Sequence, residues 1–179
     1  MARGFSKSIR VWAATAIAPG LMFASSGSTP SSARTLAEQV GRELMSLAYY
    51  GVFDDLSFRV DAGKVTLSGQ VTQPVLKEDA ERAVRRIPGV ESVVDQIEVL
   101  PLSRVDDQIR RGVYYAVYGY APLERYGLGS QPAIRIIVKN GRVTLTGSVA
   151  SQMDRLLVYQ RANSVPGVSA VNNQLLVEA

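Results

Sequence analysis

One short phrase occurs twice in this sequence. Residues 63–71 read GKVTLSGQV and residues 141–149 read GRVTLTGSV, 78 positions later. The flanks repeat at the same offset without a gap, because Pro88-Gly89-Val90 recurs as Pro166-Gly167-Val168. A tandem duplication of one small module explains this match better than chance. The chain is therefore expected to fold as two copies of the same unit.

Each copy begins with a pattern of apolar residues at spacings of three and four, which predicts a helix. The apolar positions are Leu36, Val40, Leu44 and Leu47 in the first copy and Val105, Ile109, Val113, Ala116 and Val117 in the second. Thr35 with Glu38 is a possible capping box. We interpret the acidic pair Asp106 and Asp107 as first-turn residues favoured by the helix dipole. Asp54-Asp55 is interpreted as the turn that leaves the first copy's helix.

The repeated phrase itself predicts a β-hairpin. Asn140-Gly141 is a strong two-residue turn signal, and Ala62-Gly63 is its weaker equivalent. In the strand that follows, apolar and polar residues alternate, so one face is buried. Gly69 and Gly147 interrupt the buried row at the same place, which indicates either a helix packed close to the strand or a bulge. The glycines to which we assign a structural role are Gly63, Gly69, Gly89, Gly141, Gly147 and Gly167.

A second helix and a last strand complete each copy. The helix begins after Thr72-Gln73-Pro74 in the first copy and at Ser151, with Asp154, in the second. It ends at the Pro-Gly pair, and the strand follows as VESVVDQIEV or VSAVNNQLLV. The predicted fold is α+β: two αββαβ modules, at residues 34–100 and 101–179, each with a three-stranded mixed sheet packed against two helices.

Residues 1–33 differ from the rest of the chain. A start with Arg3, Lys7 and Arg10 is followed by the apolar run VWAATAIAPGLMFA and then by small polar residues. This order predicts a secretory signal peptide and a polar linker, with a buried amphipathic helix as the alternative. The sequence has no cysteine for lipid attachment. We therefore expect a periplasmic protein without a lipid anchor.

The composition also bears on chemistry. The chain contains neither cysteine nor histidine, so disulfides, thiolate metal sites and the commonest general base are excluded. We see no arrangement of carboxylates, lysine or serine that indicates catalysis, and we expect no cofactor, no metal and no small-molecule substrate. Nucleic-acid binding is disfavoured by the export signal and by the near-neutral charge of the chain without its leader.

The hairpin phrase, followed by a helix that ends at PGV, resembles the BON domain in both copies. The resemblance covers residues from about 35 to 178 as two tandem domains. The family is named for bacterial osmotic-stress and nodulation proteins. Membership implies a periplasmic protein that binds phospholipid membranes or envelope proteins without catalysis, and that supports envelope integrity or tolerance of osmotic stress.

The second copy carries aromatic and basic residues around the segment APLERYGLGSQP, which makes the connection from its first helix to its hairpin about nine residues longer than in the first copy. We call this segment the insertion. Residues 34–100 have 8 basic and 11 acidic side chains, a net charge of −3, whereas residues 101–179 have 9 and 5, a net charge of +4. Tyrosine suits the headgroup level of a bilayer, and arginine pairs with phosphate. The candidate lipid- or partner-binding residues are Arg110, Arg111, Tyr114, Tyr115, Tyr118, Arg125 and Tyr126.

Three interpretations of this tyrosine face remain open: an interface between the modules, docking onto anionic phospholipid, or a site for an envelope protein. The leading function is therefore lipid binding through the second module. The alternative is an adaptor or chaperone-like module that binds envelope proteins, for which an exposed sheet edge would serve.

Overall fold

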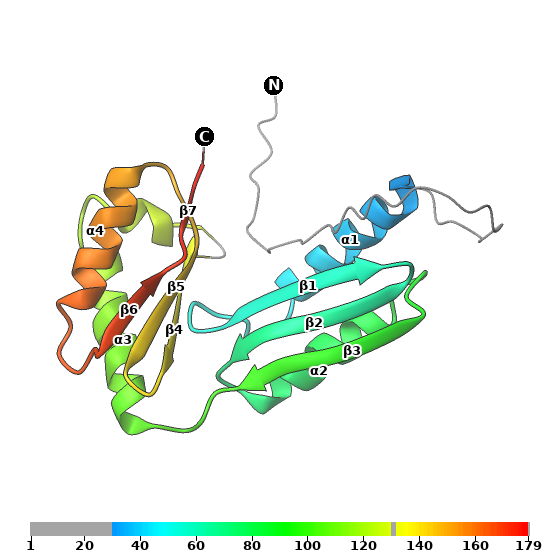
Figure 1. Ribbon diagram of the computed structural model, residues 1–179, viewed down its shortest axis with the longest axis horizontal. Helices are drawn as coiled ribbons and strands as arrows, with labels where there is room; N and C mark the ends of the chain where they lie inside the picture. The colour runs from blue at the N-terminus through cyan, green and yellow to red at the C-terminus, as the bar shows by residue number, and fades with distance from the viewer. Residues whose placement is uncertain (1–29, 130–131, 179) are drawn as a thin grey trace, which may run out of the picture.

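The computed structural model describes residues 30–129 and 132–178, which form two successive units of helices and sheet (Figure 1). The signal peptide and linker are predicted for residues 1–33, and residues 1–29 of that segment lie outside the described residues. The first unit consists of α1 (Pro30–Met45), β1 (Asp55–Asp61), β2 (Lys64–Val71), α2 (Pro74–Arg85) and β3 (Ser92–Val99). The second consists of α3 (Arg104–Tyr118), η1 (Glu124–Gly127), β4 (Ile134–Lys139), β5 (Arg142–Val149), α4 (Gln152–Asn163), β6 (Ala170–Asn173) and β7 (Leu176–Val177). None of the described helices is both long and apolar enough to cross a bilayer.

Each unit has a mixed sheet, which confirms the predicted α+β fold. β2 pairs with β1 antiparallel and with β3 parallel, and β5 pairs in the same way with β4 and β6. The prediction of one continuous last strand over residues 168–177 is wrong, because this strand is divided into β6 and β7. At the break, the side-chain Nδ2 of Asn173 donates to the carbonyl oxygen of Arg155 at 3.0 Å, and its Oδ1 accepts from the backbone N–H of Leu175 at 3.2 Å. The bond to Arg155 has no equivalent in the continuous strand β3, because Asp95 at the matching position carries no amide donor.

The two helices of each unit cover one face of its sheet (Figure 1). The predicted apolar residues Val40 and Leu44 on α1, and Ile109 and Val113 on α3, lie in the two cores. Val105 is the exception, because it is 60% exposed, whereas its neighbour Asp106 is the residue of the first turn that faces the sheet. Burying such aliphatic side chains stabilises each core by about 1.5–3 kcal/mol per residue.

The hairpin turns have the conformation that the sequence predicts. The φ angles are 45° at Ala62, 83° at Gly63, 52° at Asn140 and 75° at Gly141. In the second unit the carboxylate of Asp106 accepts the N–H groups of Asn140 and Gly141, at 2.9 and 2.8 Å. Asp106 therefore fastens the start of α3 to the hairpin, while the helix itself is capped by another residue, Ser103.

Gly69 and Gly147 are required by a close approach of two strands. Their φ angles are 125° and 110°. A Cβ atom at Gly69 would lie 2.1 Å from the carbonyl oxygen of Asp55, and one at Gly147 would lie 2.0 Å from that of Ala133. The neighbour is thus the backbone at the start of the adjacent strand, so the prediction of a helix packed against these glycines is wrong.

Two local predictions in the first unit are also corrected. α1 begins at Pro30, so Thr35 and Glu38 lie inside the helix and form no capping box at its start. Asp54 closes a turn over residues 51–54, some residues after the end of α1, through the bond of its N–H to the carbonyl oxygen of Gly51 at 3.3 Å. It is also buried, and its carboxylate accepts the N–H of Gly51 at 3.0 Å and that of Thr72 at 2.7 Å. Asp55, which follows, already belongs to β1.

The loop between α1 and β1 joins the two units. The backbone N–H of Ile136 on β4 donates to the carbonyl oxygen of Val52 at 2.8 Å. The buried Arg135 donates to the carbonyl oxygen of Gly51 at 2.6 Å, and its guanidinium lies 4.1 Å from the ring centroid of Tyr50. Burial raises the pKa of Tyr50 to about 12, although the nearby Arg135 opposes the rise. The first unit thus covers the edge of β4, and the strand is buried from Ile134 to Val138.

Candidate functional site

The aromatic and basic residues predicted as a binding face lie on α3 and in the loop that follows it. α3 starts at Ser103, whose Oγ accepts the N–H of Asp106 at 3.2 Å. The negative charge of Asp106 and Asp107 in the first turn suits the positive end of the helix dipole. Because Ile109 and Val113 fix one side of the helix in the core, the opposite side faces solvent.

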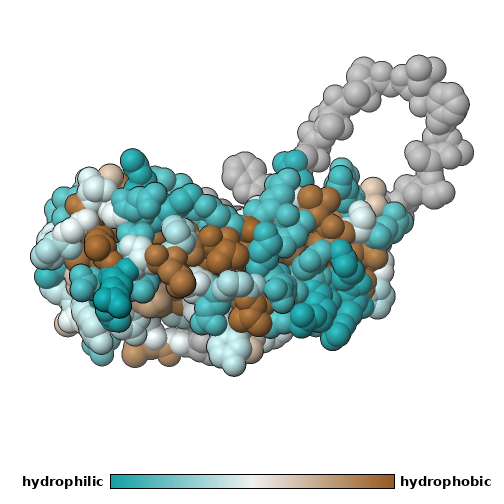
Figure 2. Space-filling view, turned by 90° about the horizontal axis from the view of Figure 1, so that it is seen from below, coloured by the Kyte–Doolittle hydropathy of each residue, from teal (hydrophilic) through white to brown (hydrophobic). Residues whose placement is uncertain are grey.

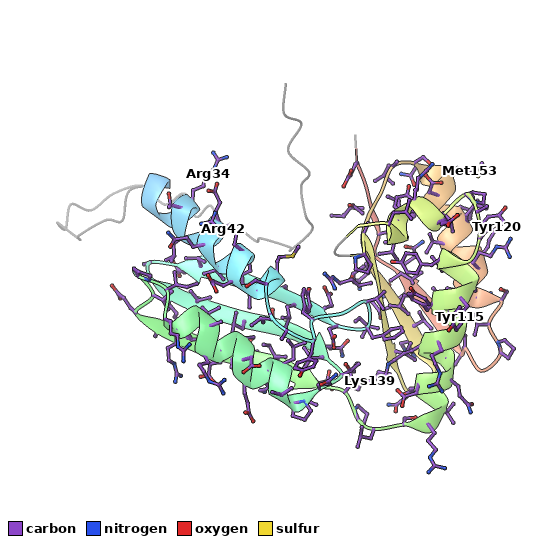
Figure 3. The ribbon with its side chains drawn as sticks, turned by 180° about the vertical axis from the view of Figure 1, so that it is seen from behind. Arg34, Arg42, Tyr115, Tyr120, Lys139 and Met153 are labelled. Carbon is purple, nitrogen blue, oxygen red and sulfur yellow. The ribbon has the colours of Figure 1, made fainter. Side chains whose placement is uncertain are left out.

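Arg111 and Tyr115 lie on this solvent side. Arg111 is exposed, and it forms no ion pair with any residue in the part of the chain that the structure describes. Tyr115 is 70% exposed. Figure 3 shows Tyr115 on the side of the second unit that is turned away from the first. These two residues provide a free cation and an accessible aromatic ring, one helical turn apart.

Arg110 and Tyr118 are buried, and both hold α3 onto β4. Arg110 donates to the carbonyl oxygen of Val138 at 2.7 Å and also pairs with Asp107. The hydroxyl of Tyr118 donates to the carbonyl oxygen of Ile134 at 2.5 Å, and burial raises the pKa of this phenol. The structure therefore removes both side chains from the accessible surface and gives them a role in packing.

Tyr114 lies at the junction between the two units. Its ring centroid is 6.2 Å from that of Phe53, which belongs to the first unit, and the two rings meet edge to face. It also lies 5.0 Å from the ring of Tyr118, and it is 37% exposed. One of the predicted tyrosines thus takes part in the contact between the units, while Tyr115 does not.

Arg125 and Tyr126 form a polar network with the start of α4. Arg125 donates to the carboxylate of Asp154 at 2.7 Å, and the hydroxyl of Tyr126 donates to it at 2.9 Å. Burial raises the pKa of Asp154, but hydrogen bonds from Ser151 and Tyr126 and the charge of Arg125 outweigh it, so the net pKa is lowered. This network ties the insertion to α4. The side chain of Arg125 nevertheless remains 56% exposed.

The insertion also explains why Tyr118 is buried. A Cβ atom at Gly127 would lie 2.9 Å from the ring of Tyr118, so the insertion passes directly over this ring. The helical position of Tyr118 is close to that of Arg111, and the periodicity of α3 therefore places it on the solvent side. The sequence shows that an insertion exists but contains no signal for the direction in which it folds back.

A second exposed feature of this unit was absent from the sequence predictions. Three apolar residues on α4 reach the surface: Met153 is 63% exposed, Leu156 49% and Tyr159 38%. Hydrophobic side chains also appear among hydrophilic ones on the face of the molecule shown in Figure 2. A comparison of the two copies would have found the feature on α4, because Leu156 and Tyr159 replace Glu78 and Glu81 at the 78-residue offset.

The buried acidic residues of the described part of the chain have structural partners. Among residues 30–129 and 132–178, no three His, Cys, Asp or Glu side chains are grouped so that they could hold a metal ion. The buried carboxylates Asp54, Asp106 and Asp154 each accept hydrogen bonds that fix a loop or a helix start. The arrangement can instead bind an anionic surface through exposed guanidinium groups and aromatic or aliphatic side chains.

A family model described as the BON domain matches residues 32–101 and 122–179. The second match starts after α3, so the helix that carries Arg111 and Tyr115 lies outside the matched residues. No curated protein matches the chain.

Two solved structures are similar to it, both of CdsD, a structural protein of the type III secretion system of Chlamydia trachomatis, one of them its C-terminal domain. Each is 14% identical and covers 80% of this chain, and the matches cover 93% and 98% of those chains. The TM-score is 0.29 in both cases, too low to support any argument.

Proposed function

Because this chain belongs to the BON domain family, we propose that it is a non-catalytic periplasmic protein that binds the anionic phospholipid surface of the cell envelope through its second module. By touching the membrane reversibly, the protein would support envelope integrity under osmotic stress. The observation that carries this proposal is the exposed side of α3, where Arg111 is exposed and the 70% exposed Tyr115 lies on the side turned away from the first module.

The distribution of charge supports the choice of the second module. Residues 101–179 carry 9 basic and 5 acidic side chains, a net charge of +4, against −3 for residues 34–100. An anionic bilayer therefore attracts the second module and repels the first, which orients the molecule. Arg104, at the start of α3, is exposed like Arg111 and adds to the positive charge of this helix.

The binding expected from this surface is weak and reversible. Each arginine near an anionic leaflet contributes about 1 kcal/mol, and this contribution decreases with salt. A tyrosine ring at the headgroup level adds apolar contact while its hydroxyl stays hydrated. With two or three such contacts, the protein binds weakly and is released from the membrane at high salt, unlike a protein with a permanent anchor.

Vesicle sedimentation tests the proposal. We expect the wild-type protein to sediment with vesicles that contain phosphatidylglycerol at low salt, and to remain in solution with pure phosphatidylcholine. Arg111→Glu should lower the affinity at least about tenfold, because it replaces an attraction of about 1 kcal/mol with a repulsion of similar size.

Arg42→Glu is the matched control. Arg42 is an exposed arginine on α1, two residues before the buried Leu44, as Arg111 is two residues before the buried Val113. The two substitutions change the net charge of the protein equally. A wild-type protein that ignores anionic vesicles at low salt, or equal losses from Arg111→Glu and Arg42→Glu, would refute the proposal for the second module.

A further inference from the structure

α4 has an outer face that the architecture does not explain. Its inner side is fixed by Val158 and Ala162, which are fully buried. Met153, Leu156 and Tyr159 lie away from this inner side and are 38–63% exposed. A helix that covers a sheet ordinarily presents polar residues to water. This apolar outer face, defined by these three residues, therefore requires another reason.

The first module provides an internal control for this face. α2 and α4 occupy the same place in their modules, and their bounds, 74–85 and 152–163, differ by the 78-residue offset. At the positions of Leu156 and Tyr159, α2 has Glu78 and Glu81. Two ion pairs lie along α2, Asp79 with Arg82 and Glu81 with Arg85. The fold thus tolerates a charged outer face here, so the apolar one on α4 is not needed for folding.

The outer face of α4 is also free of the contact between the modules. α3 and α4 form a layer on the side of the second sheet that is turned away from the first module (Figures 1 and 3). Figure 3 shows Met153 on this side, as it shows Tyr115 on α3. A flat partner could therefore meet both helices without touching the first module.

Basic side chains border this face. Arg161 lies with its guanidinium 3.7 Å from the ring centroid of Tyr120, and Arg155 donates to the carbonyl oxygen of Asn173 at 3.3 Å. The one acidic residue of α4, Asp154, is buried and paired with Arg125. A second copy on this face would bring arginines together, whereas an anionic surface would neutralise them. Exposed apolar residues bordered by arginine are typical of helices that lie in an anionic membrane interface.

We propose that the apolar outer face of α4 inserts into the anionic phospholipid surface beside Arg111 and Tyr115 of α3. This inference rests on the proposed function and deepens it, because it adds an element that enters the bilayer to one that is attracted by charge. α4 then lies parallel to the membrane plane, with Leu156 and Tyr159 at the boundary between headgroups and acyl chains.

The test uses a variant that removes apolar surface without changing charge: Leu156→Gln with Tyr159→Gln. Both positions are exposed, so we expect unchanged circular dichroism and thermal unfolding. The control is Val75→Gln with Tyr49→Gln, which removes one aliphatic and one aromatic side chain from the first module, where they are 40% and 69% exposed. Affinity for phosphatidylglycerol vesicles is measured by sedimentation over a range of salt concentrations.

We expect the α4 variant to lose about tenfold in affinity at every salt concentration, with an unchanged dependence on salt, and the control to bind like the wild type. Arg111→Glu should reduce the salt dependence instead. Wild-type binding by the α4 variant, or equal losses in variant and control, would overturn the inference while the proposed function stands. The inference is also overturned if the wild-type protein is a dimer and the α4 variant is a monomer. A wild-type protein that binds no vesicles refutes the proposed function itself.

Discussion

At the scale of single residues, the repeated phrase is maintained by backbone geometry. Gly69 and Gly147 occupy the same place in the two copies, both with positive φ, and both face a carbonyl oxygen of the adjacent strand. Any side chain would collide with this oxygen. Glycine is therefore required at this position of both phrases, because β1 lies close to β2 and β4 lies close to β5.

Substitution of Gly147 by alanine tests this requirement. The added Cβ would lie 2.0 Å from the carbonyl oxygen of Ala133, and alanine disfavours a φ of 110°. We expect Gly147→Ala to lower the free energy of unfolding by about 3 kcal/mol, measured by urea denaturation. Gly129→Ala, in the exposed insertion, should change it little. A Gly147→Ala protein as stable as the wild type would show that the strands can separate at no cost.

At the scale of secondary-structure elements, much of the fold followed from the sequence. Period-two alternation and Asn140-Gly141 predicted the hairpin, and apolar spacing predicted the part of α3 that contains Ile109 and Val113. These signals are local, because turn chemistry and periodicity depend on neighbours along the chain. The break between β6 and β7 lies where Asn173 contacts α4, a distant segment of the chain, and the local pattern does not reveal it.

The candidate site was predicted less well, for the same reason. Periodicity places Arg111 and Tyr118 on one side of α3, yet the insertion covers Tyr118 and leaves Arg111 exposed. Arg110 was predicted as a binding residue, but its side chain is buried and donates to the carbonyl oxygen of Val138. Both outcomes depend on contacts between distant segments. The exposed face of α4, in contrast, was visible from the alignment of the two copies.

β4 differs from the other strands because it is covered on both sides. Apart from Arg135 and the terminal Lys139, its sequence IRIIVK is apolar without alternation, which is typical of a strand buried on both faces. The helices of its own module cover one side, and the loop of Tyr50 and Phe53 from the first module contributes to the cover of the other. Arg135, within this strand, is therefore the residue through which the two modules are most directly joined.

We expect Arg135→Ala to lower the free energy of unfolding by about 2–3 kcal/mol, because it leaves the carbonyl oxygen of Gly51 without this donor and uncovers the ring of Tyr50. We expect calorimetry to show one transition for the wild-type protein and separate transitions of the two modules for the variant. Arg142→Ala, at an exposed position on β5, should behave like the wild type. A single unchanged transition for Arg135→Ala would show that the modules are held by other contacts.

At the scale of the whole molecule, two copies of one fold carry different surfaces. The helix α2 of the first module carries two ion pairs along its surface, whereas α4 of the second exposes the three apolar side chains Met153, Leu156 and Tyr159. The first module also contributes its α1–β1 loop to the second, and the layer of α3 and α4 lies at the end of the molecule away from the first module. This division suits a protein that meets a planar anionic surface with one end and keeps the other in solution.

The most direct test of this orientation uses the absence of cysteine from the chain. A single cysteine introduced by Leu156→Cys on α4, or by Glu78→Cys on α2, allows an environment-sensitive fluorophore to be attached at either of two matched positions. On addition of phosphatidylglycerol vesicles, the label at position 156 should shift to the blue and be quenched by brominated acyl chains, while the label at position 78 should stay in water. Equal responses at both positions, or a response at position 78 alone, would contradict the account.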